Sequence, residues 1–593
     1  MKSIKIILLL GIIFIISCED FLSRTPLNNL SDASFFKQDG DFKLFTDGFY
    51  TYFTEGPSPS IWLEYRTDLI GQWAPKSGNR SYPELHNGNM SPTSNAASIY
   101  WNWVPIRNAY TLLESIDNVE LSETNKKIYL GTTYYLLAYR YFIMFRAYER
   151  VPIIKKVLEI SESDVPSSPK EDVFAEALDN INKAIDLLPS LSPSERERGR
   201  LTKLVALTLK ADLLLYTSSY YNESIPGAKY KDAALAAKSA LDEANSKGYG
   251  LCNDFNSLFI ADKQADAEPQ KEIIFEYVRL KTIATNSFSY HNFGPHKDKI
   301  GWGDFSLTQE CVDMFECVDG KKINKSSIYN PEAPFENRDP RFTLTTIYPG
   351  RICTFNNGQK WIANTLSEYE YDNIGNKTNV INNDYMKTIE SPLDRSPSGY
   401  INIKYWDRYN RDGGHTSFIN YRYSELMLMY AEAMNEAYGP SSEVYDILTE
   451  LRARPTVEMP PITEEDYPTK AALRDLIHNE RVVELLCEGK RYWDLKRWHL
   501  FEERLNMTHN SMHIAKTFNP DGTTATFMDK LNIVVSLDKS ITKDFDIPNG
   551  VNGGELMHTS IFPKDEKYYV WPIPEYAINA SKTKALKQHP LWE

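Results

Sequence analysis

The chain has 593 residues with 66 Lys and Arg against 80 Asp and Glu, which gives a formal net charge of −14 at pH 7. This acidic balance argues against a nucleic-acid partner, because phosphate groups are bound by basic patches. The 32 prolines and 28 glycines are too few for a low-complexity polymer, so a globular chain is expected. Aromatic residues make up 13% of the chain, and part of this surplus is expected to face a ligand.

The N-terminus has the pattern of an export signal. Lys2 and Lys5 precede an apolar core of about a dozen residues, shorter than the ~20 that a membrane-spanning helix needs. The tetrapeptide Ile-Ile-Ser-Cys at 15–18 resembles a bacterial lipobox, in which the cysteine receives a lipid before the signal is removed. Residues 1–17 are therefore predicted to be a lipoprotein signal peptide, and Cys18 the lipidated first residue of the mature chain. The alternative is an ordinary secretory signal with an incidental cysteine.

Helical periodicity predicts most of the scaffold. After a tether at 18–31, apolar residues recur at three- and four-residue spacing. In chain order the predicted helices are 32–53, 99–119, 123–152, 172–189, 201–222, 229–250, 421–439 and 442–455. Pro152 is predicted to end the third helix, and Gly248 or Gly250 to cap the sixth. Successive helices joined by short turns resemble tetratricopeptide-type pairs, but their irregular spacing favours one scaffold over an open array.

Helical periodicity is lost in two regions, 54–98 and about 250–420. In the second region, residues 272–280 (EIIFEYVRL) have the β-branched and aromatic alternation of a strand. Both regions are otherwise rich in turn-forming residues and also contain Trp and Tyr. Long irregular loops that extend from a rigid helical scaffold often bind ligands. A sugar ring stacks on an aromatic ring while polar side chains bind its hydroxyls. The candidate glycan-binding residues are Trp73, Tyr82, Tyr290, His291 and Trp302, and the alternative for each is a half-buried packing residue.

Enzyme motifs are missing from the sequence. It contains no GxSxG, GxGxxG or GxxxxGK[ST] pattern. His509 and His513 share an i, i+4 spacing, but Asn510 stands where HExxH metalloproteases have glutamate. The two histidines are therefore interpreted as polar surface residues, and no catalytic or metal-binding residue is predicted.

Two groups of acidic side chains could serve as the acid and base of a glycosidase. That reaction depends on the distance between the two carboxyl groups, which the sequence does not report. Such groups are Asp313 with Glu316, and Glu368 with Glu370 and Asp372. We interpret all of these acidic residues as side chains on solvent-exposed faces. The acidic, Asn-rich turn YEYDNIGNK lacks an EF-hand pattern, so no motif supports a structural calcium and no cofactor is predicted.

Five cysteines follow Cys18 at wide spacing: Cys252, Cys311, Cys317, Cys353 and Cys487. An odd number in a chain of this length does not indicate a disulfide framework, and no CxxC pair indicates zinc. They are interpreted as buried small hydrophobic residues, with a bridge between Cys311 and Cys317 as the alternative.

The C-terminal third carries the most specific motif. Residues 479–498, NERVVELLCEGKRYWDLKRW, resemble the signature of the SusD/RagB family of outer-membrane nutrient-binding lipoproteins. That signature is a helix with Glu-Arg, a Glu-Gly turn, then an aromatic residue and Asp-Leu-x-Arg-Trp. The segment predicts a helix that ends at Gly489 and a second helix that carries Trp493 and Trp498.

Three charged residues of this motif, Glu480, Arg481 and Glu484, are expected to be partners in a structural polar network and not catalysts. The sequence departs from the family pattern at Cys487, where a small or aromatic residue is more usual, and at Lys490, where histidine is commoner. Four further stretches resemble the family in the same order: 18–37, 336–350, 421–436 and 567–592.

The resemblance implies a mainly α, SusD-like fold, with four tetratricopeptide-like helix pairs as scaffold, a large irregular loop-rich lobe and a few short strands. It implies a lipid-anchored protein on the cell surface of the outer membrane in Bacteroidota. Such a protein captures oligosaccharides and delivers them to a SusC-like TonB-dependent transporter, acting as its lid without catalysis. The alternatives are the same role with a peptide or other nutrient as cargo, a surface glycoside hydrolase, and a helical-repeat lipoprotein that binds only proteins.

We expect residues 32–593 to form a single SusD-like domain. The helix-pair scaffold is expected mainly at 97–250 and 420–500, and the loop-rich ligand lobe mainly at 54–96 and 250–420. The early helix pairs, about 97–221, are expected to contribute most to the contact with the barrel.

Overall fold

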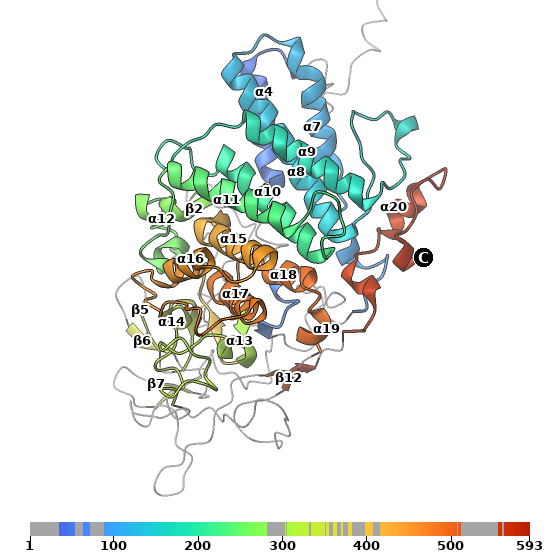
Figure 1. The fold of residues 1–593 in the computed structure, drawn as a ribbon. Helices are drawn as coiled ribbons and strands as arrows, with labels where there is room; N and C mark the ends of the chain where they lie inside the picture. Colours follow the sequence, from blue (N-terminus) through green and yellow to red (C-terminus); the bar gives the residue numbers. More distant parts are fainter. Residues whose placement is uncertain are drawn as a thin grey trace, which may run out of the picture.

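A computed structural model defines the fold. It describes residues 35–53, 63–71, 88–280, 303, 305–330, 334–349, 351–354, 360–363, 369–371, 377–381, 396, 398–406, 415–506, 508–510, 556–559 and 562–593. The long helices occupy the upper and middle parts of Figure 1, and the short strands lie mostly below them. The mainly helical fold class predicted from the sequence is confirmed.

The helices follow the predicted order closely. The long ones are α4 (Asp39–Phe53), α7 (Val104–Ser115), α8 (Glu123–Tyr148), α9 (Lys170–Leu187), α10 (Lys203–Tyr220), α11 (Tyr230–Ser246), α15 (Tyr423–Tyr438), α16 (Ser442–Arg452) and α17 (Lys470–Leu485). The short ones are α12 (Ala267–Glu272), α13 (Gln309–Asp313), α14 (Pro340–Thr345), α18 (Arg491–Arg497), α19 (Phe501–Arg504) and α20 (Glu575–Ala580). Across the ranges given above, none of them has both the length and the apolar composition to cross a membrane.

Local chemistry explains where several helices begin and end. The side chains of Ser122 and Thr469 accept backbone N–H groups in the first turns of α8 and α17, at 3.2 Å in both cases. Helix α8 ends at Tyr148, before Pro152, because Glu149 already has a left-handed backbone with φ +60°. Gly248 follows α11 with φ +78°, which confirms a glycine cap at this helix.

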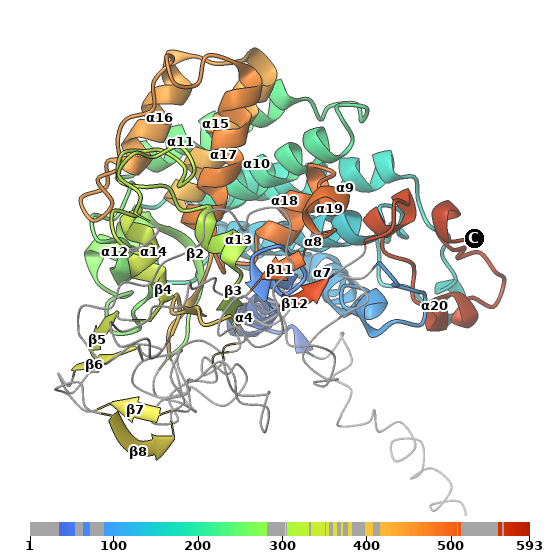
Figure 2. The same cartoon turned by 90° about the horizontal axis from the view of Figure 1, so that it is seen from below.

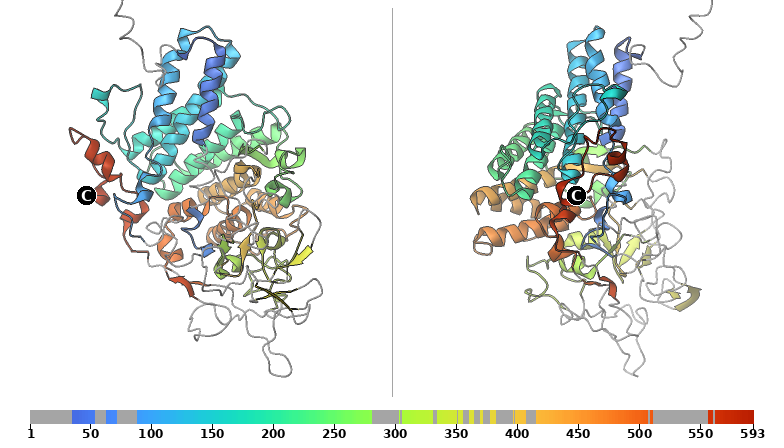
Figure 3. Two further views of the ribbon diagram at one scale, coloured as in Figure 1. Left: turned by 180° about the vertical axis from the view of Figure 1, so that it is seen from behind. Right: turned by 90° about the vertical axis from the view of Figure 1, so that its right-hand side faces the viewer.

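The helices pack as a continuous stack. Helix α8 packs against α4, α7 and α9, α10 against α9 and α11, α11 against α15, and α15 against α16 and α17. The right-hand view of Figure 3 shows this succession from the blue helices at the top to the orange helices below. The tetratricopeptide type of the pairs, and the division of the chain into scaffold and lobe, stay predictions.

The described strands form two-stranded antiparallel sheets only. The pairs are β1 (Ile70–Gly71) with β3 (Ser306–Leu307), β2 (Ile273–Tyr277) with β10 (Phe418–Arg422), β4 (Thr346–Ile347) with β9 (Ile401–Asn402), β5 (Ile352–Thr354) with β6 (Lys360–Ile362), β7 (Tyr369–Tyr371) with β8 (Lys377–Ile381), and β11 (Thr508–Asn510) with β12 (Leu556–Thr559). Strand β2 confirms the strand predicted at 272–280. Figure 2 shows the β7–β8 hairpin at the edge of the molecule, away from the helix stack.

Two hydrophobic cores meet at α17. Leu473, Leu476 and Ile477 of this helix belong to the core of the helix stack. Val482 and Val483, near its C-terminal end, belong to a second core that also contains residues of α13, α14, β3 and β9. Helix α17 therefore joins the stack to the part of the chain that carries the short strands.

Part of the aromatic surplus has a structural explanation. Trp571 is fully buried, stacks on Tyr100 at a ring distance of 5.3 Å and donates its indole N–H to Tyr492 at 3.0 Å. Several tyrosines of the helix stack, among them Tyr135 and Tyr148, are likewise buried. The surplus therefore serves the core as well as any ligand surface.

Two helical glycines should respond in opposite ways to alanine substitution. A Cβ on the buried Gly131 of α8 would lie 2.9 Å from Leu188 Cγ, whereas Gly48 of α4 is exposed with nothing within 4 Å of the added atom. We expect Gly131→Ala to lower the free energy of unfolding by ~1–3 kcal/mol through overpacking. Gly48→Ala should raise it by up to about 1 kcal/mol through helix propensity. Urea denaturation of both variants measures the difference, and equal effects at the two positions would contradict the packing described for α8 and α9.

Candidate functional site

The motif at 479–498 spans the second half of α17, a tight turn and α18. The predicted helix end at Gly489 is wrong, because α17 ends at Leu485. The chain leaves the helix at Leu486, whose ψ is 129°, and positive φ angles of +58° at Cys487 and +77° at Gly489 follow, so helical geometry does not continue to Gly489. The second predicted helix is confirmed as α18, which carries Trp493 and ends at Arg497, one residue before Trp498.

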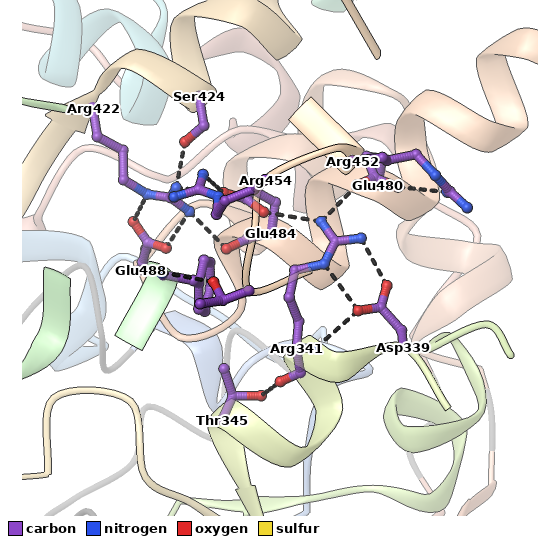
Figure 4. Close-up of polar contacts among 12 residues, drawn as sticks. Asp339, Arg341, Thr345, Arg422, Ser424, Arg452, Arg454, Glu480, Glu484 and Glu488 are labelled. Atoms are coloured by element: carbon purple, nitrogen blue, oxygen red, sulfur yellow. Dashed lines mark hydrogen bonds and ion pairs between the residues drawn. The ribbon is translucent and has the colours of Figure 1, made fainter. Parts of the chain in front are cut away.

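The acidic side chains of α17 point into a group of buried arginines (Figure 4). The Glu484 carboxylate accepts hydrogen bonds from Arg422 Nη1 at 2.6 Å, Arg454 Nη2 at 3.0 Å and Arg341 Nη1 at 2.9 Å. One turn earlier, Glu480 accepts from Arg341 Nη1 at 2.6 Å as well. Arg341 therefore bridges two successive turns of α17 on one face of the helix.

Further partners extend the cluster outward from Glu484. Glu488 accepts from Arg422 Nη2 at 2.8 Å and from Lys404 Nζ at 2.6 Å. Glu272 accepts from Arg422 Nη1 at 2.9 Å and from Arg454 Nη1 at 2.7 Å. We call the whole set the charge network; its members are Glu272, Glu316, Asp339, Arg341, Lys404, Arg422, Arg452, Arg454, Glu480, Glu484 and Glu488, each 4% exposed or less.

The charge network holds the carboxylate of Glu484, at its centre, in the ionised form. Burial by itself would raise the pKa of Glu484, but the guanidinium groups of Arg422, Arg454 and Arg341 outweigh it and hold this pKa well below the usual range. Burial lowers the pKa of the Lys404 ammonium, whose nearest carboxylate is Glu488. Carboxylates held by several donors are poor proton acceptors, so the arrangement is suited to holding segments together. The predicted structural roles of Glu480 and Glu484 are confirmed.

Arg481 belongs to a second buried cluster, which joins α17 to α18 and α15. Its Nε and Nη2 donate to the two oxygens of Asp494 at 2.9 and 3.0 Å. Arg497 donates to Asp494 and to Glu432 of α15, and the Trp498 indole N–H donates to Glu432 at 2.8 Å. Burial of Glu432 is outweighed by Arg497, which lowers the pKa of this carboxyl to about 2. This cluster confirms the structural role predicted for Arg481.

A cavity of about 70 Å³ lies beside these clusters, where α8 and α10 face β10, α15, α17 and α18. Charged side chains in its wall include Arg146, Asp212, Glu425, Arg481 and Lys490, and aromatic rings of both layers complete it. We call this space the polar cavity. Arg146, Asp212 and Lys490 in this wall are partly exposed.

The five candidate glycan-binding residues, Trp73, Tyr82, Tyr290, His291 and Trp302, lie outside the described residues, as does Cys18. Their role as a set stays a prediction. His513, Glu368 and Asp372 also lie outside the described residues.

The solvated-face interpretation of Asp313 and Glu316 is wrong. Glu316 is 3% exposed and accepts a hydrogen bond from Arg452 at 2.8 Å, so it is a member of the charge network. Asp313 is partly buried and accepts from the Gln309 amide at 2.8 Å, and burial raises the pKa of Asp313 to about 6. A buried arginine partner for Glu316 replaces both the surface and the glycosidase interpretations.

The interpretation of the cysteines as buried residues is confirmed for Cys252, Cys311, Cys317 and Cys487, which are buried free thiols. The alternative Cys311–Cys317 bridge is therefore not formed. His509 lies on strand β11 rather than on a helix, so the i, i+4 geometry does not apply to it. Within the described ranges, no three His, Cys, Asp or Glu side chains are grouped as a metal site.

Sequence reasoning missed the basic half of the charge network. Arg341, Arg422 and Lys404 reach α17 from positions 62 to 143 residues away in the chain. The Arg-Asp-Pro-Arg run at 338–341 was a usable signal, because it lies in a stretch that resembles the family. Its contact with α17 could not be inferred from spacing.

The fold is thus a stack of helices that buried ion pairs join to a region of short hairpins and loops. A sequence model of the SusD family matches residues 271–592. The chain therefore belongs to the SusD family.

Curated relatives and solved structures agree with this assignment. Two SusD-like proteins of Formosa agariphila are 24% and 23% identical to the chain over 521 and 530 residues, which cover 84% and 85% of this chain and 91% and 92% of theirs. A SusD-like carbohydrate-binding protein of Bacteroides fragilis superposes with a TM-score of 0.71 at 21% identity, covering 94% of this chain and all of the other. A laminarin-binding SusD-like protein superposes with a TM-score of 0.56 at 17% identity, with the same coverage. At 21% and 17% identity, these two solved structures show that the fold is shared, and they do not assign a ligand to this chain.

Proposed function

We propose that this protein is a lipid-anchored, cell-surface protein of the outer membrane that captures oligosaccharides and delivers them to a SusC-like TonB-dependent transporter, acting as its lid without catalysis. The single observation that carries the proposal is membership of the SusD family, from the match at 271–592. The carbohydrate-binding and laminarin-binding proteins of the same fold support a glycan as the ligand. The lipobox-like segment that ends at Cys18 supports the anchor.

The charge network supports a binding role for the part of the chain that carries the short strands. It ties Asp339 and Arg341, at the start of α14, and Lys404, after β9, to α17 of the helix stack. Fixing this part of the chain to the helix stack would lower the entropy that it loses when a ligand binds. The rings of Trp73, Tyr82, Tyr290 and Trp302, with His291, would then stack on or hydrogen-bond to the sugar.

Removal of two of these rings should abolish most glycan binding. An aromatic ring that stacks on a ligand contributes about 1–1.5 kcal/mol, so the double variant Trp73→Ala/Trp302→Ala is expected to bind on the order of a hundredfold more weakly. The measurement is affinity gel electrophoresis against a panel of soluble polysaccharides that includes laminarin, followed by calorimetry on the tightest binder. Tyr576→Ala, which removes a ring that is 58% exposed on α20, is the matched control and should bind like the parent.

Three results would contradict parts of the proposal. Parent-like affinity in the double variant would remove these residues as the site. New reducing ends on labelled oligosaccharides would indicate a glycoside hydrolase. Binding of peptides with no binding of any glycan in the panel would change the cargo.

A further inference from the structure

A half-open apolar groove lies along α4, at the upper end of the helix stack in Figure 1. Its volume is about 280 Å³, and its lining includes Phe35, Leu44, Phe45, Gly48, Phe49 and Tyr52. The last five of these recur at three- and four-residue spacing, so they form one stripe along the helix. Leu44 is 65% exposed, and none of the described residues that line the groove is charged. We call this space the apolar groove.

Aromatic rings and one glycine shape the apolar groove. Phe45 packs edge-on against Phe49, with ring centroids 5.4 Å apart. Gly48 is exposed, and a Cβ placed on it would meet nothing within 4 Å, so the groove is open above this residue. Next to α7, the Asn108 amide donates to the Tyr52 hydroxyl at 3.0 Å. A leucine side chain has four carbon atoms, each about the size of a water molecule at ~30 Å³, so the groove has room for two leucines.

The chain enters the described body beside this groove. Phe35 is the first described residue, and it is part of the groove wall. Residues 25–31, just before it, have the sequence TPLNNLS, which carries no charge and has leucines at 27 and 30. A flexible chain of the eight residues from Leu27 to Phe35 spans ~16 Å on average. That span is close to the ~12 Å that residues 44–52 cover along the axis of α4.

We propose that the apolar groove binds the N-terminal segment of its own chain, with the side chains of Leu27 and Leu30 on the stripe of α4. A segment attached this close to its site has an effective concentration in the millimolar range, so contacts from two apolar side chains suffice. In a lipid-anchored protein, docking would shorten the free tether that follows Cys18 from about 60 Å to about 30 Å and hold the body near the membrane. This consequence rests on the proposed anchor, whereas the docking does not.

Disulfide trapping tests the docking in the chain from residue 18, with Cys18→Ser to leave out the lipid. Ser31→Cys, next to the leucines, is combined either with Gly48→Cys in the groove or with Lys43→Cys. Lys43 is exposed on the same helix, about 140° around its axis from Gly48. We expect the variant with Gly48→Cys to form its disulfide within one molecule at least tenfold faster, as measured by mass spectrometry of the linked peptides. Equal rates in the two variants would overturn the proposal.

The two leucines are tested in the background of the faster variant. Leu27→Asp/Leu30→Asp should slow its disulfide formation at least tenfold, because a charged side chain does not enter an apolar groove. Asn28→Asp/Asn29→Asp adds the same charge at the neighbouring positions but keeps both leucines, so the rate should stay that of the starting variant. The same rate with either pair of substitutions would overturn the proposal, because chain proximity alone would then account for the trapping.

A second copy of the protein is the other occupant that this experiment detects. Gly48→Cys without Ser31→Cys should form disulfide-linked dimers no faster than Lys43→Cys does. Dimers that form faster with Gly48→Cys, at a rate that rises with protein concentration, would place a second copy in the groove and overturn the proposal.

Discussion

Replacement of Glu484 by glutamine is expected to lower the free energy of unfolding by about 3–5 kcal/mol. The carboxylate accepts hydrogen bonds from Arg341, Arg422 and Arg454 within a fully buried region. Glutamine keeps the size but loses the charge, and its NH₂ group would face guanidinium donors. Breaking a buried ion pair in this way leaves uncompensated charge in a low-dielectric interior. Urea denaturation followed by tryptophan fluorescence measures the loss.

The matched control for this variant is Asp242→Asn. Asp242 pairs with Lys238 at i, i+4 spacing on the surface of α11, and both side chains are largely exposed. Exposed pairs of this kind contribute ~0.5 kcal/mol or less. A loss at Glu484 no larger than the loss at Asp242 would show that the charge network does not hold the body together.

Stability should fall as the pH rises from about 4.5 to 7, and Glu64→Gln should abolish that part of the slope. Glu64 is 1% exposed; its Oε1 accepts from the backbone N–H of Lys490 at 3.0 Å, while its Oε2 is buried without a partner. Burial raises the pKa of Glu64 to about 7, against the opposing effect of the nearby Arg491. The folded state therefore keeps a proton that the unfolded state releases, which stabilises the fold at low pH and is lost as the pH rises through 7.

The expected size of this effect is about 3 kcal/mol between pH 4.5 and 8, from the difference between the ordinary and the raised pKa. Glu64→Gln should match the parent near pH 5 and exceed it in stability at pH 8. The measurement is urea denaturation at four pH values, with the exposed Glu503→Gln variant as control. A parallel pH dependence in the parent and in Glu64→Gln would refute the assignment of a buried, protonated Glu64.

The long helices were predictable because their signals are local. Helices α9, α11 and α16 follow an apolar period of three and four residues, whereas α10 and the second half of α8 are long apolar runs that are buried nearly all round. Capping residues such as Ser122 precede the helix starts. The end of α17 was not predictable in the same way. Its sequence continues with helix-compatible residues to Gly489, but the chain leaves the helix at Leu486, and the backbone N–H of Lys490 in this turn donates to Glu64, 426 residues away in the chain.

The site was less predictable than the fold, and for a physical reason. The motif indicated that Glu480, Arg481 and Glu484 serve structure, since they lie on a helix with a defined buried face. Their partners come from distant segments, as with Arg341, whose contact with Glu484 joins residues 143 positions apart. Glu316 was misread because an acidic side chain is expected to face solvent until a buried partner such as Arg452 is known. Aromatic residues in predicted loops, such as Trp73, carry no positional signal in the sequence, since stacking on a ligand depends on where the side chain lies in the fold.

The charge network also fixes the order in which the protein can complete its folding. Its members come from residue 272 to residue 488, so the network cannot close until the chain beyond residue 488 is available. A nascent chain that stops earlier exposes arginines and carboxylates with no partners, and contacts of such long sequence separation form slowly. Helices α7 to α11, whose contacts are local, can form while the rest is still being made. The two halves of the body are therefore expected to join only when synthesis of the chain is nearly complete.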